Sequence, residues 1–183
     1  MRARWLQVIS ILAILVVLAP AARSADDPPL LPLTAFFANP QASWDYRVSP
    51  DGSRLAWIAT RQGRATLHVR RLDETTARAV ETPREVRPPW PGTQSFWWTR
   101  DSKRLLFQMD SNGDENAHLF AVDVEASELV ARDLTPLEGV RVEFMRTLGD
   151  DPNAVIVAHT GRTGRMLDLY RLNLATGQMT LFA

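Results

Sequence analysis

Residues 48–73 read VSPDGSRLAWIATRQGRATLHVRRLD, a turn sequence followed by two stretches in which apolar and polar residues alternate. Leu55 and Trp57 mark the first stretch, and Leu67 and Val69 mark the second. Alternation with a period of two residues is typical of β-strands that bury one face. The segment therefore predicts a tight turn followed by two strands, in an all-β fold.

The same pattern returns twice, without a gap, at a spacing of 50 residues: WTRDSKRLLFQMDSNGDENAHLFAVD from residue 98 and LGDDPNAVIVAHTGRTGRMLDLYRLN from residue 148. A turn aspartate falls at the same place in each repeat, namely at Asp51, Asp101 and Asp151. An apolar residue closes each third strand, namely Leu72, Val122 and Leu172. Each unit continues into another turn and a short final strand. Four strands per unit at this period are typical of a β-propeller blade.

We therefore expect a partial β-propeller of about three four-stranded blades, at about residues 44–93, 94–141 and 142–183. A complete propeller has roughly 4 to 8 blades. Three blades leave apolar faces open, and such faces indicate a missing partner surface. We expect further blades in a longer protein, with association of several copies or a partner chain as the less favoured way to cover those faces. A truncated product that does not fold stably is a third interpretation.

The first 25 residues are expected to be a signal peptide. Arg2 and Arg4 precede an apolar run at residues 6–18, and small residues typical of a cleavage site follow. The run is shorter than the roughly 20 residues that span a bilayer, which favours cleavage over an uncleaved anchor, so no stable membrane span is expected. A proline-rich lead segment at residues 26–43 follows. The protein is thus predicted to be exported, either periplasmic or secreted.

The composition favours neither nucleic acid nor anionic lipid as a partner. Lysine plus arginine equals aspartate plus glutamate, at 21 each, so no overall field attracts nucleic acid or anionic lipid. The chain contains no cysteine, which excludes disulfides and a lipid-bearing cysteine after the signal. No cofactor is expected.

Residues 110–116, DSNGDEN, are unusually acidic for a hairpin between two strands. Their side chains at alternate positions could coordinate a hard cation such as Ca²⁺, the weak metal candidates being Asp110, Asn112 and Asp114. An EF-hand loop would need glycine in place of Glu115 and glutamate in place of Ala121. Turn formation is therefore the preferred interpretation, ahead of contacts to another domain or cation binding. Pairing of Asp114 or Glu115 with an arginine of a neighbouring blade is a further hypothesis.

No catalytic residue is expected in the chain. A G-x-S-x-G nucleophile elbow is absent, and so is the βαβ alternation that could support one. His68 and His118 occupy equivalent places in two repeats, so solvent-facing strand positions explain both, while His159 falls at a strand end or turn. Phe96, Trp97 and Trp98 are predicted to pack on an innermost strand rather than to form a ligand-stacking platform.

Together these segments resemble the amino-terminal propeller of the prolyl oligopeptidase family of serine peptidases, in particular its secreted bacterial acylaminoacyl-peptidase and dipeptidyl-aminopeptidase-like members. The stretches that carry the resemblance are LPLTAFF, VSPDGSRLAWIA, FWWTRDSKRLLFQMDSNGDENAHLFAVDV, DLTPLEGVR and DLYRLNLATGQ. The combination of GDEN, LF-x-VD and DLTP-x-EGVR is more specific than SPDG alone. The motif residues that we take as structural are Ser49, Pro50, Asp51, Gly52, Asp101, Gly113, Asp114, Glu115 and Asn116.

The resemblance implies a seven-bladed type of propeller followed by an α/β-hydrolase domain with a serine, aspartate and histidine triad, which admits only short peptides. Since this chain contains neither nucleophile elbow nor triad, we expect it to gate peptide access to a catalytic domain that it does not itself contain, and to be inactive alone. The alternative is a non-catalytic, TolB-like periplasmic propeller that binds or scaffolds other molecules.

Overall fold

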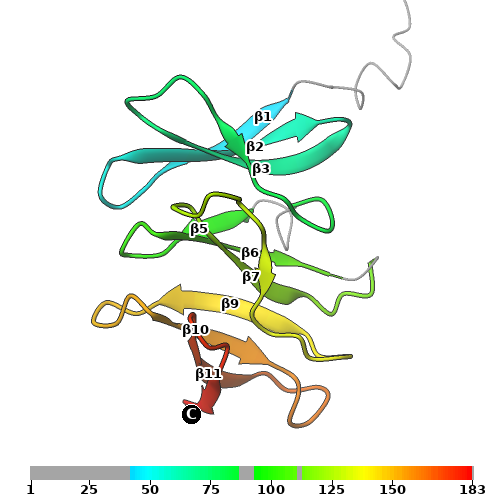
Figure 1. The fold of residues 1–183 in the computed structure, drawn as a ribbon. Coiled ribbons are helices and arrows are strands. Elements are labelled where there is room, and N and C mark those ends of the chain that lie inside the picture. The colour runs from blue at the N-terminus through cyan, green and yellow to red at the C-terminus, as the bar shows by residue number, and fades with distance from the viewer. Residues whose placement is uncertain (1–41, 87–92, 111–112, 183) are drawn as a thin grey trace, which may run out of the picture. The chain divides into compact units, whose positions relative to one another are not determined.

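The computed structural model describes residues 42–86, 93–110 and 113–182, which form β-strands joined by turns and loops (Figure 1). The strands make three separate four-stranded antiparallel sheets, which confirms the predicted all-β, partial-propeller fold. Within those three ranges, no helix has the length and apolar character needed to cross a membrane. The expected signal peptide and nearly all of the lead segment lie outside the described residues.

The first sheet contains β1 (Ser43–Val48), β2 (Arg54–Arg61), β3 (Arg64–Arg71) and β4 (Arg78–Ala79), in that spatial order. β2 and β3 pair in register along their whole length. The two residues between them, Gln62 and Gly63, have φ angles of 52° and 76°. A two-residue loop with positive φ at both positions matches the twist of antiparallel strands, so this turn fixes the register of the pair.

The other two sheets have the same meandering order. The second contains β5 (Phe96–Trp98), β6 (Arg104–Met109), β7 (His118–Asp123) and β8 (Arg132–Asp133). The third contains β9 (Val142–Thr147), β10 (Ala154–His159), β11 (Asp168–Asn173) and β12 (Met179–Leu181). The second strands of the three sheets begin 50 residues apart, at Arg54, Arg104 and Ala154.

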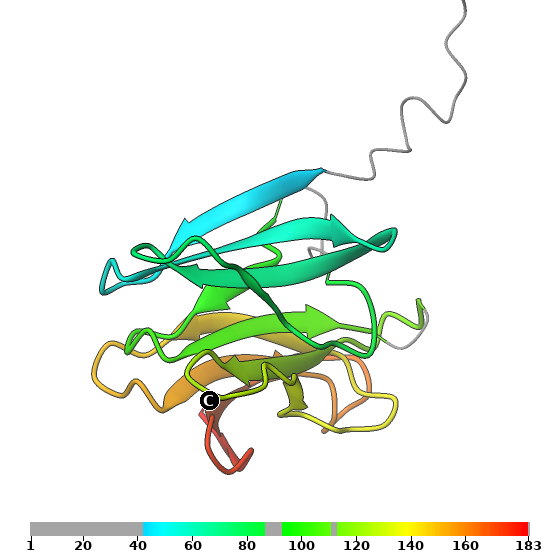
Figure 2. The same ribbon diagram turned by 45° about the horizontal axis from the view of Figure 1, so that its top comes forward.

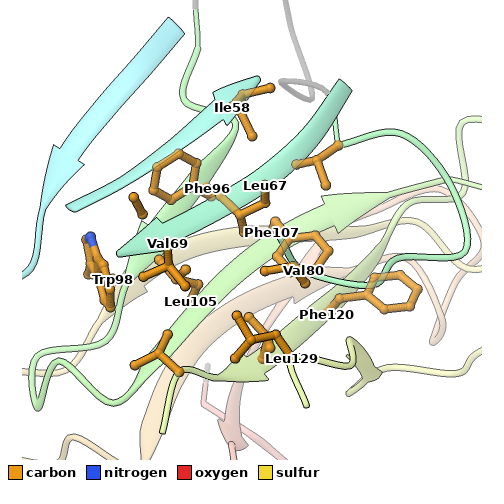
Figure 3. Packing of buried hydrophobic residues seen from close by; sticks show 14 of the residues in the cluster. Ile58, Leu67, Val69, Val80, Phe96, Trp98, Leu105, Phe107, Phe120 and Leu129 are labelled. Carbon is orange, nitrogen blue, oxygen red and sulfur yellow. The ribbon is translucent and has the colours of Figure 1, made fainter. Parts of the chain in front are cut away.

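The three sheets follow one another in sequence order, and Figures 1 and 2 show the second sheet between the first and the third. One buried cluster joins the first sheet to the second and includes Ile58, Leu67, Phe96 and Phe107 (Figure 3). Another joins the second sheet to the third and includes Leu106, Leu119, Val155 and Leu172. Each fully buried side chain of this size contributes roughly 1.5–3 kcal/mol, so packing between the sheets stabilises the described part of the chain.

The middle sheet is covered on both faces, and its burial pattern shows this. In β6, the five residues from Leu105 to Met109 are all buried, because alternate side chains enter the two different clusters. In β2, buried Ala56 and Ile58 alternate with half-buried neighbours such as Trp57. The first sheet therefore has one packed face and one face that the described residues do not bury fully.

One expectation about the apolar pattern is wrong. Leu72 was expected to close a strand as Val122 and Leu172 do, and those two are buried, whereas Leu72 is 47% exposed. The reason is local, since β3 ends at Arg71 and Leu72 begins the following turn. Leu72 thus lies one residue beyond the strand that it was expected to close.

Candidate functional site

The innermost strands of the three sheets border a shared groove of about 440 Å³. β1, β5 and β9 hold the innermost position of their sheets in a propeller arrangement. The groove is lined by residues of these strands and of the adjoining segments, namely Arg47, Val48, Pro50, Gln94, Trp97, Trp98, Phe144, Met145, Arg146 and Thr147. A groove of this size is within the range of small-molecule and peptide sites, so we take it as the candidate functional site.

Aromatic side chains of β5 form part of the wall. Successive side chains on a strand point to opposite faces, so Phe96 and Trp98 join the cluster with the first sheet while Trp97 packs toward the third. The ring of Trp97 lies 4.5 Å from the ring of Phe144, centroid to centroid. The Trp98 indole N–H donates to the Arg47 carbonyl at 3.2 Å. The predicted inner-strand packing of the three aromatic residues is confirmed.

Arg47 is held in place at one side of the groove. Its Nη2 lies 2.8 Å from Oδ1 of Asp45, and the other carboxylate oxygen of Asp45 accepts the Ser95 backbone N–H at 2.8 Å. The Nε atom of Arg47 is buried and has no hydrogen-bond partner. Buried donors are nearly always paired in native proteins, so this atom distinguishes Arg47 from an ordinary surface arginine.

Arg146 lies on the part of the groove formed by β9. A β-bulge in the pairing of β9 with β10 places Phe144 opposite Val157 and Arg146 opposite Ile156, with Met145 as the extra residue. Met145 is 51% exposed, and Arg146 is also exposed. Across the three described ranges, the side chain of Arg146 makes no hydrogen bond or ion pair. The groove therefore carries one guanidinium group whose charge no neighbouring carboxylate balances.

The acidic hairpin DSNGDEN connects β6 to β7, as predicted for a turn. Gly113 and Glu115 have φ angles of 82° and 60°, and the Asp114 carboxylate accepts the backbone N–H of Asn116 at 3.1 Å. The side chain of Arg84, which follows the first sheet, donates to the backbone carbonyl of Asp110. An arginine from the segment that follows the first sheet thus reaches this hairpin and contacts the hairpin backbone.

The cation hypothesis for this hairpin stays untested, because Asn112 lies outside the described residues. Asp110 and Asp114 flank that position at the two ends of the hairpin. Within residues 42–86, 93–110 and 113–182, no three histidine, cysteine or acidic side chains gather closely enough to hold a metal ion.

The SPDG motif and its counterpart around Asp101 shape the turns that lead into the second strands. The Ser49 hydroxyl donates to the Asp51 carboxylate at 2.6 Å, and the Thr99 hydroxyl donates to Asp101 at 2.6 Å. The hydroxyl of Ser49, followed by the groups of Ser53, holds the pKa of Asp51 well below its usual range. Gly52 has a φ of 73°, which glycine adopts at little cost. Each motif residue described here therefore has a role in the turn.

The three histidines lie in three different sheets. The His68 ring stacks on the Trp57 ring at 5.6 Å, and the His159 ring stacks on that of Tyr170 at 3.8 Å. His118 is 2.7 Å from a carboxylate oxygen of Asp133 and 3.0 Å from the carbonyl of Leu137. The expectation that His68 and His118 face solvent is wrong, because both are half-buried.

His159 stands at the end of β10, as predicted, and is buried. Its Nδ1 atom accepts the Gly161 backbone N–H at 3.1 Å. Each histidine therefore has local structural partners on its own sheet or on the loop that follows, and the described residues bring none of them to a serine in a nucleophile–base pair.

The chain matches no known protein-family model. It is 31% identical over 167 residues to dipeptidyl aminopeptidase BIII of Pseudoxanthomonas mexicana, and this match covers 89% of the chain and 23% of the relative. Among solved structures, the β-propeller domain of the Trilobed protease from Pyrococcus furiosus has a TM-score of 0.53 and 17% identity, covering 77% of this chain and 43% of that one. TolB from Acinetobacter baumannii has a TM-score of 0.52 and 17% identity, with coverage of 78% and 32%.

The sequence match lies in the amino-terminal part of a peptidase, and the structural neighbours are propellers. The chain corresponds to the amino-terminal propeller portion of the prolyl oligopeptidase family. The predicted resemblance is thereby confirmed. This propeller portion spans about a quarter of the curated relative's length, 23%.

Sequence reasoning did not find the groove of this propeller portion. Its wall comes from three strands about 50 residues apart, and Arg146 reaches it next to a bulge. A β-bulge inserts one extra residue into a strand, and no particular residue type in the sequence marks its position. The one sequence signal that pointed here was the aromatic run Phe96–Trp98, which was predicted to pack on an innermost strand.

Proposed function

We propose that this chain forms the first three blades of the propeller of an exported prolyl oligopeptidase-type serine peptidase, and that it restricts the access of peptides to a catalytic domain in the rest of a longer protein. Peptide hydrolysis in that family type requires a serine activated by a histidine. The described residues supply the propeller wall, and the bond-breaking groups belong to the proposed remainder.

The observation that carries the proposal is the groove on β1, β5 and β9. These strands border the centre of a propeller, so a peptide that travels through the centre passes along this wall. The wall combines the apolar rings of Trp97 and Phe144 with polar groups from Arg47 and Gln94. Such a surface supports contact with extended peptides, which present both side chains and backbone groups.

The uncovered face of the first sheet supports the existence of further blades. On the face opposite to the buried cluster, Tyr46, Trp57 and His68 form a ladder of stacked rings, with centroids 6.0 and 5.6 Å apart. Tyr46 is 57% exposed and Val48 is 53% exposed. Large apolar groups gathered on one face indicate a covering partner. We propose a further blade of the same propeller as that partner.

The domain assignment belongs to the same proposal. The blades would comprise residues 44–93, 94–141 and 142–183, preceded by a lead segment at residues 26–43 and a signal peptide at residues 1–25. The motif residues would serve the turns and hairpins of these blades. Export to the periplasm or the medium rests on the amino-terminal sequence of Arg2, Arg4 and the apolar run at residues 6–18.

The proposal is tested on the native protein in the cells that produce it. An antibody against residues 42–182 would detect the protein by mass, and a fluorophosphonate probe would report an activated serine. We expect a labelled band several times heavier than the 20.6 kDa chain, located in the periplasmic or secreted fraction. A band of roughly 18 kDa, the mass after signal removal, without label would contradict it.

Restriction of substrate size needs a second measurement on the same native protein. We expect hydrolysis of short peptides and no hydrolysis of a folded protein or of a long denatured chain. Equal hydrolysis of all three would contradict the gating role. A heavier band that contains more propeller blades but resists the serine probe would instead support the TolB-like binding module.

A further inference from the structure

We propose that the inner-strand groove binds the terminal carboxylate of a short peptide, with Arg146 and Arg47 on its cationic side and the Trp97–Phe144 pair beneath the last side chain. This inference rests on the proposed function, because it names the end of the peptide that the propeller wall recognises. It assigns a binding role to Arg146, which lies outside every motif that the sequence singled out.

The charge of the groove favours an anion. Its lining contains the guanidinium groups of Arg47 and Arg146 and no carboxylate. The adjacent Asp45 is already engaged by Arg47 and by the Ser95 backbone N–H. Arg146 has no partner of opposite charge among the described residues. A ligand that carries one negative charge would therefore balance the charge of this wall.

The hydrogen-bonding groups favour a carboxylate in particular. Arginine presents several N–H donors in a planar fork that matches the two oxygens of a carboxylate. On Arg47 the Asp45 contact uses Nη2, while Nε is buried without an acceptor. Two arginines that border one groove can thus share one carboxylate.

The apolar part of the groove selects the terminal carboxylate over a side-chain carboxylate. The rings of Trp97 and Phe144 lie 4.5 Å apart and form a continuous wall, and exposed Met145 lies between Phe144 and the arginine in sequence. A peptide that ends in an apolar residue places an apolar side chain and a carboxylate on the same Cα atom. The groove is lined by complementary groups for both, namely the aromatic pair and the two arginines.

The test is a binding measurement on the chain itself, using tryptophan fluorescence and calorimetry. The probes are N-acetyl-Ala-Ala-Phe with a free carboxylate and the same peptide with a carboxyl-terminal amide. We expect the free acid to bind at least about tenfold more tightly, as charge-assisted hydrogen bonds are stronger than neutral ones. Raising the salt concentration should reduce this difference, because exposed charges are screened.

Substitution of Arg146 then tests the residue. Arg146→Gln should lower the affinity for the free acid toward that of the amide, because only Arg47 then remains, and should leave the affinity for the amide unchanged. The matched control is Arg165→Gln, since Arg165 is an exposed arginine on the β10–β11 loop and does not line the groove. Both variants should keep the thermal unfolding midpoint of the unmodified chain, because neither side chain has a hydrogen bond within the described residues.

Several outcomes overturn the inference. Equal affinity for the acid and the amide would remove the carboxylate contact while leaving peptide binding at the wall intact. Equal affinity for N-acetyl-Ala-Glu-Ala amide and the free acid would show that any carboxylate suffices. An unchanged acid affinity in Arg146→Gln, or no binding of either peptide, would also overturn it. The mass and serine-probe measurements on the native protein judge the proposed function separately.

Discussion

The guanidinium group of Arg78 donates to the backbone carbonyl of Ala126 at 2.6 Å, which joins the outermost strand of the first sheet to a turn of the second. Its second contact, at 2.8 Å, is to the carbonyl of Ser127. The same arrangement recurs one sheet further along the chain, where Arg132 of β8 donates to the carbonyl of Ala175 at 2.9 Å. The apolar clusters thus join the sheets through their faces, and these arginines join them again at the outer edge.

Replacing Arg78 with methionine should destabilise the chain. The substitution keeps most of the aliphatic length and removes the donors, so the backbone carbonyls of Val124, Ala126 and Ser127 each lose a partner. Hydrogen bonds to a charged group contribute about 1.5–3 kcal/mol, and because Arg78 is only partly buried we expect a loss near the lower value. Urea unfolding followed by fluorescence would measure this loss. An unchanged free energy of unfolding would show that the contact adds nothing to the packed faces.

Arg165→Met is the matched control for that experiment. Arg165 is exposed on the loop between β10 and β11, and its side chain has no hydrogen bond within the described part of the chain. Surface changes of this kind usually lie within about 0.5 kcal/mol. If both variants lost the same stability, the loss would come from removing positive charge in general.

The turn aspartate Asp51 should stabilise the folded protein at neutral pH and lose this contribution in acid. Its pKa is lowered in the folded state by hydrogen bonds from Ser49 and Ser53, so the unfolded chain binds this proton more tightly. A lowered pKa gives a stability contribution that is complete above the unfolded value and disappears as pH falls below it. Asp51→Asn should therefore lower the unfolding temperature at pH 7, and the gap to the unmodified chain should narrow below about pH 4.

Circular dichroism melts at pH 7, 4.5 and 3 would measure this difference in unfolding temperature between Asp51→Asn and the unmodified chain. Asp150→Asn serves as the control, because Asp150 is exposed in the corresponding third turn and has no hydrogen bond among the described residues. A gap for Asp51→Asn that stays constant over the whole pH range would contradict the contribution of its charge.

The sequence pattern predicted the local features of the fold and not those that depend on packing between sheets. The alternation around Leu67 and Val69 predicted strands with a buried face, and both residues are buried, because a period of two is a local property of a strand. The position of Leu72 could not be predicted in the same way, since the strand ends one residue before it. The groove depends on Arg47 and Arg146, which lie far apart in sequence and meet only through the packing of three sheets.

His159 should make stability depend on pH in the neutral to weakly acidic range. Burial lowers its pKa, and Asp168 opposes this only in part. The ring nitrogen Nδ1 accepts the Gly161 N–H at 3.1 Å, a bond that a protonated nitrogen cannot accept. The neutral form is thus favoured in the folded state, so stability is complete above about pH 6.5 and decreases as the pH falls below it.

The variant His159→Gln should flatten this dependence, because glutamine does not titrate in this range and its carbonyl can still accept the Gly161 N–H. Melting temperatures at pH 7.5 and 5.5 would measure it. Part of the slope should remain, because burial also lowers the pKa of His68. A slope in His159→Gln equal to that of the unmodified chain would exclude His159 as its source.

Truncating an aromatic side chain should cost different amounts of stability on the two sides of the first sheet, one packed against the second sheet and the other not covered by the described residues. Phe107 is fully buried between the first and second sheets and stacks on Phe120 at 6.0 Å, so Phe107→Ala should cost about 3–5 kcal/mol. Trp57 points to the opposite face, where it is half-buried in the ladder with Tyr46 and His68. In the isolated chain we expect Trp57→Ala to cost about 1 kcal/mol.

In a longer protein whose further blade covers this face of the first sheet, Trp57→Ala should cost nearly as much as Phe107→Ala, since a covered cavity then forms. Urea unfolding of both variants in both lengths would measure the difference, and an equal, small cost of Trp57→Ala in the two lengths would show that no blade packs on this face.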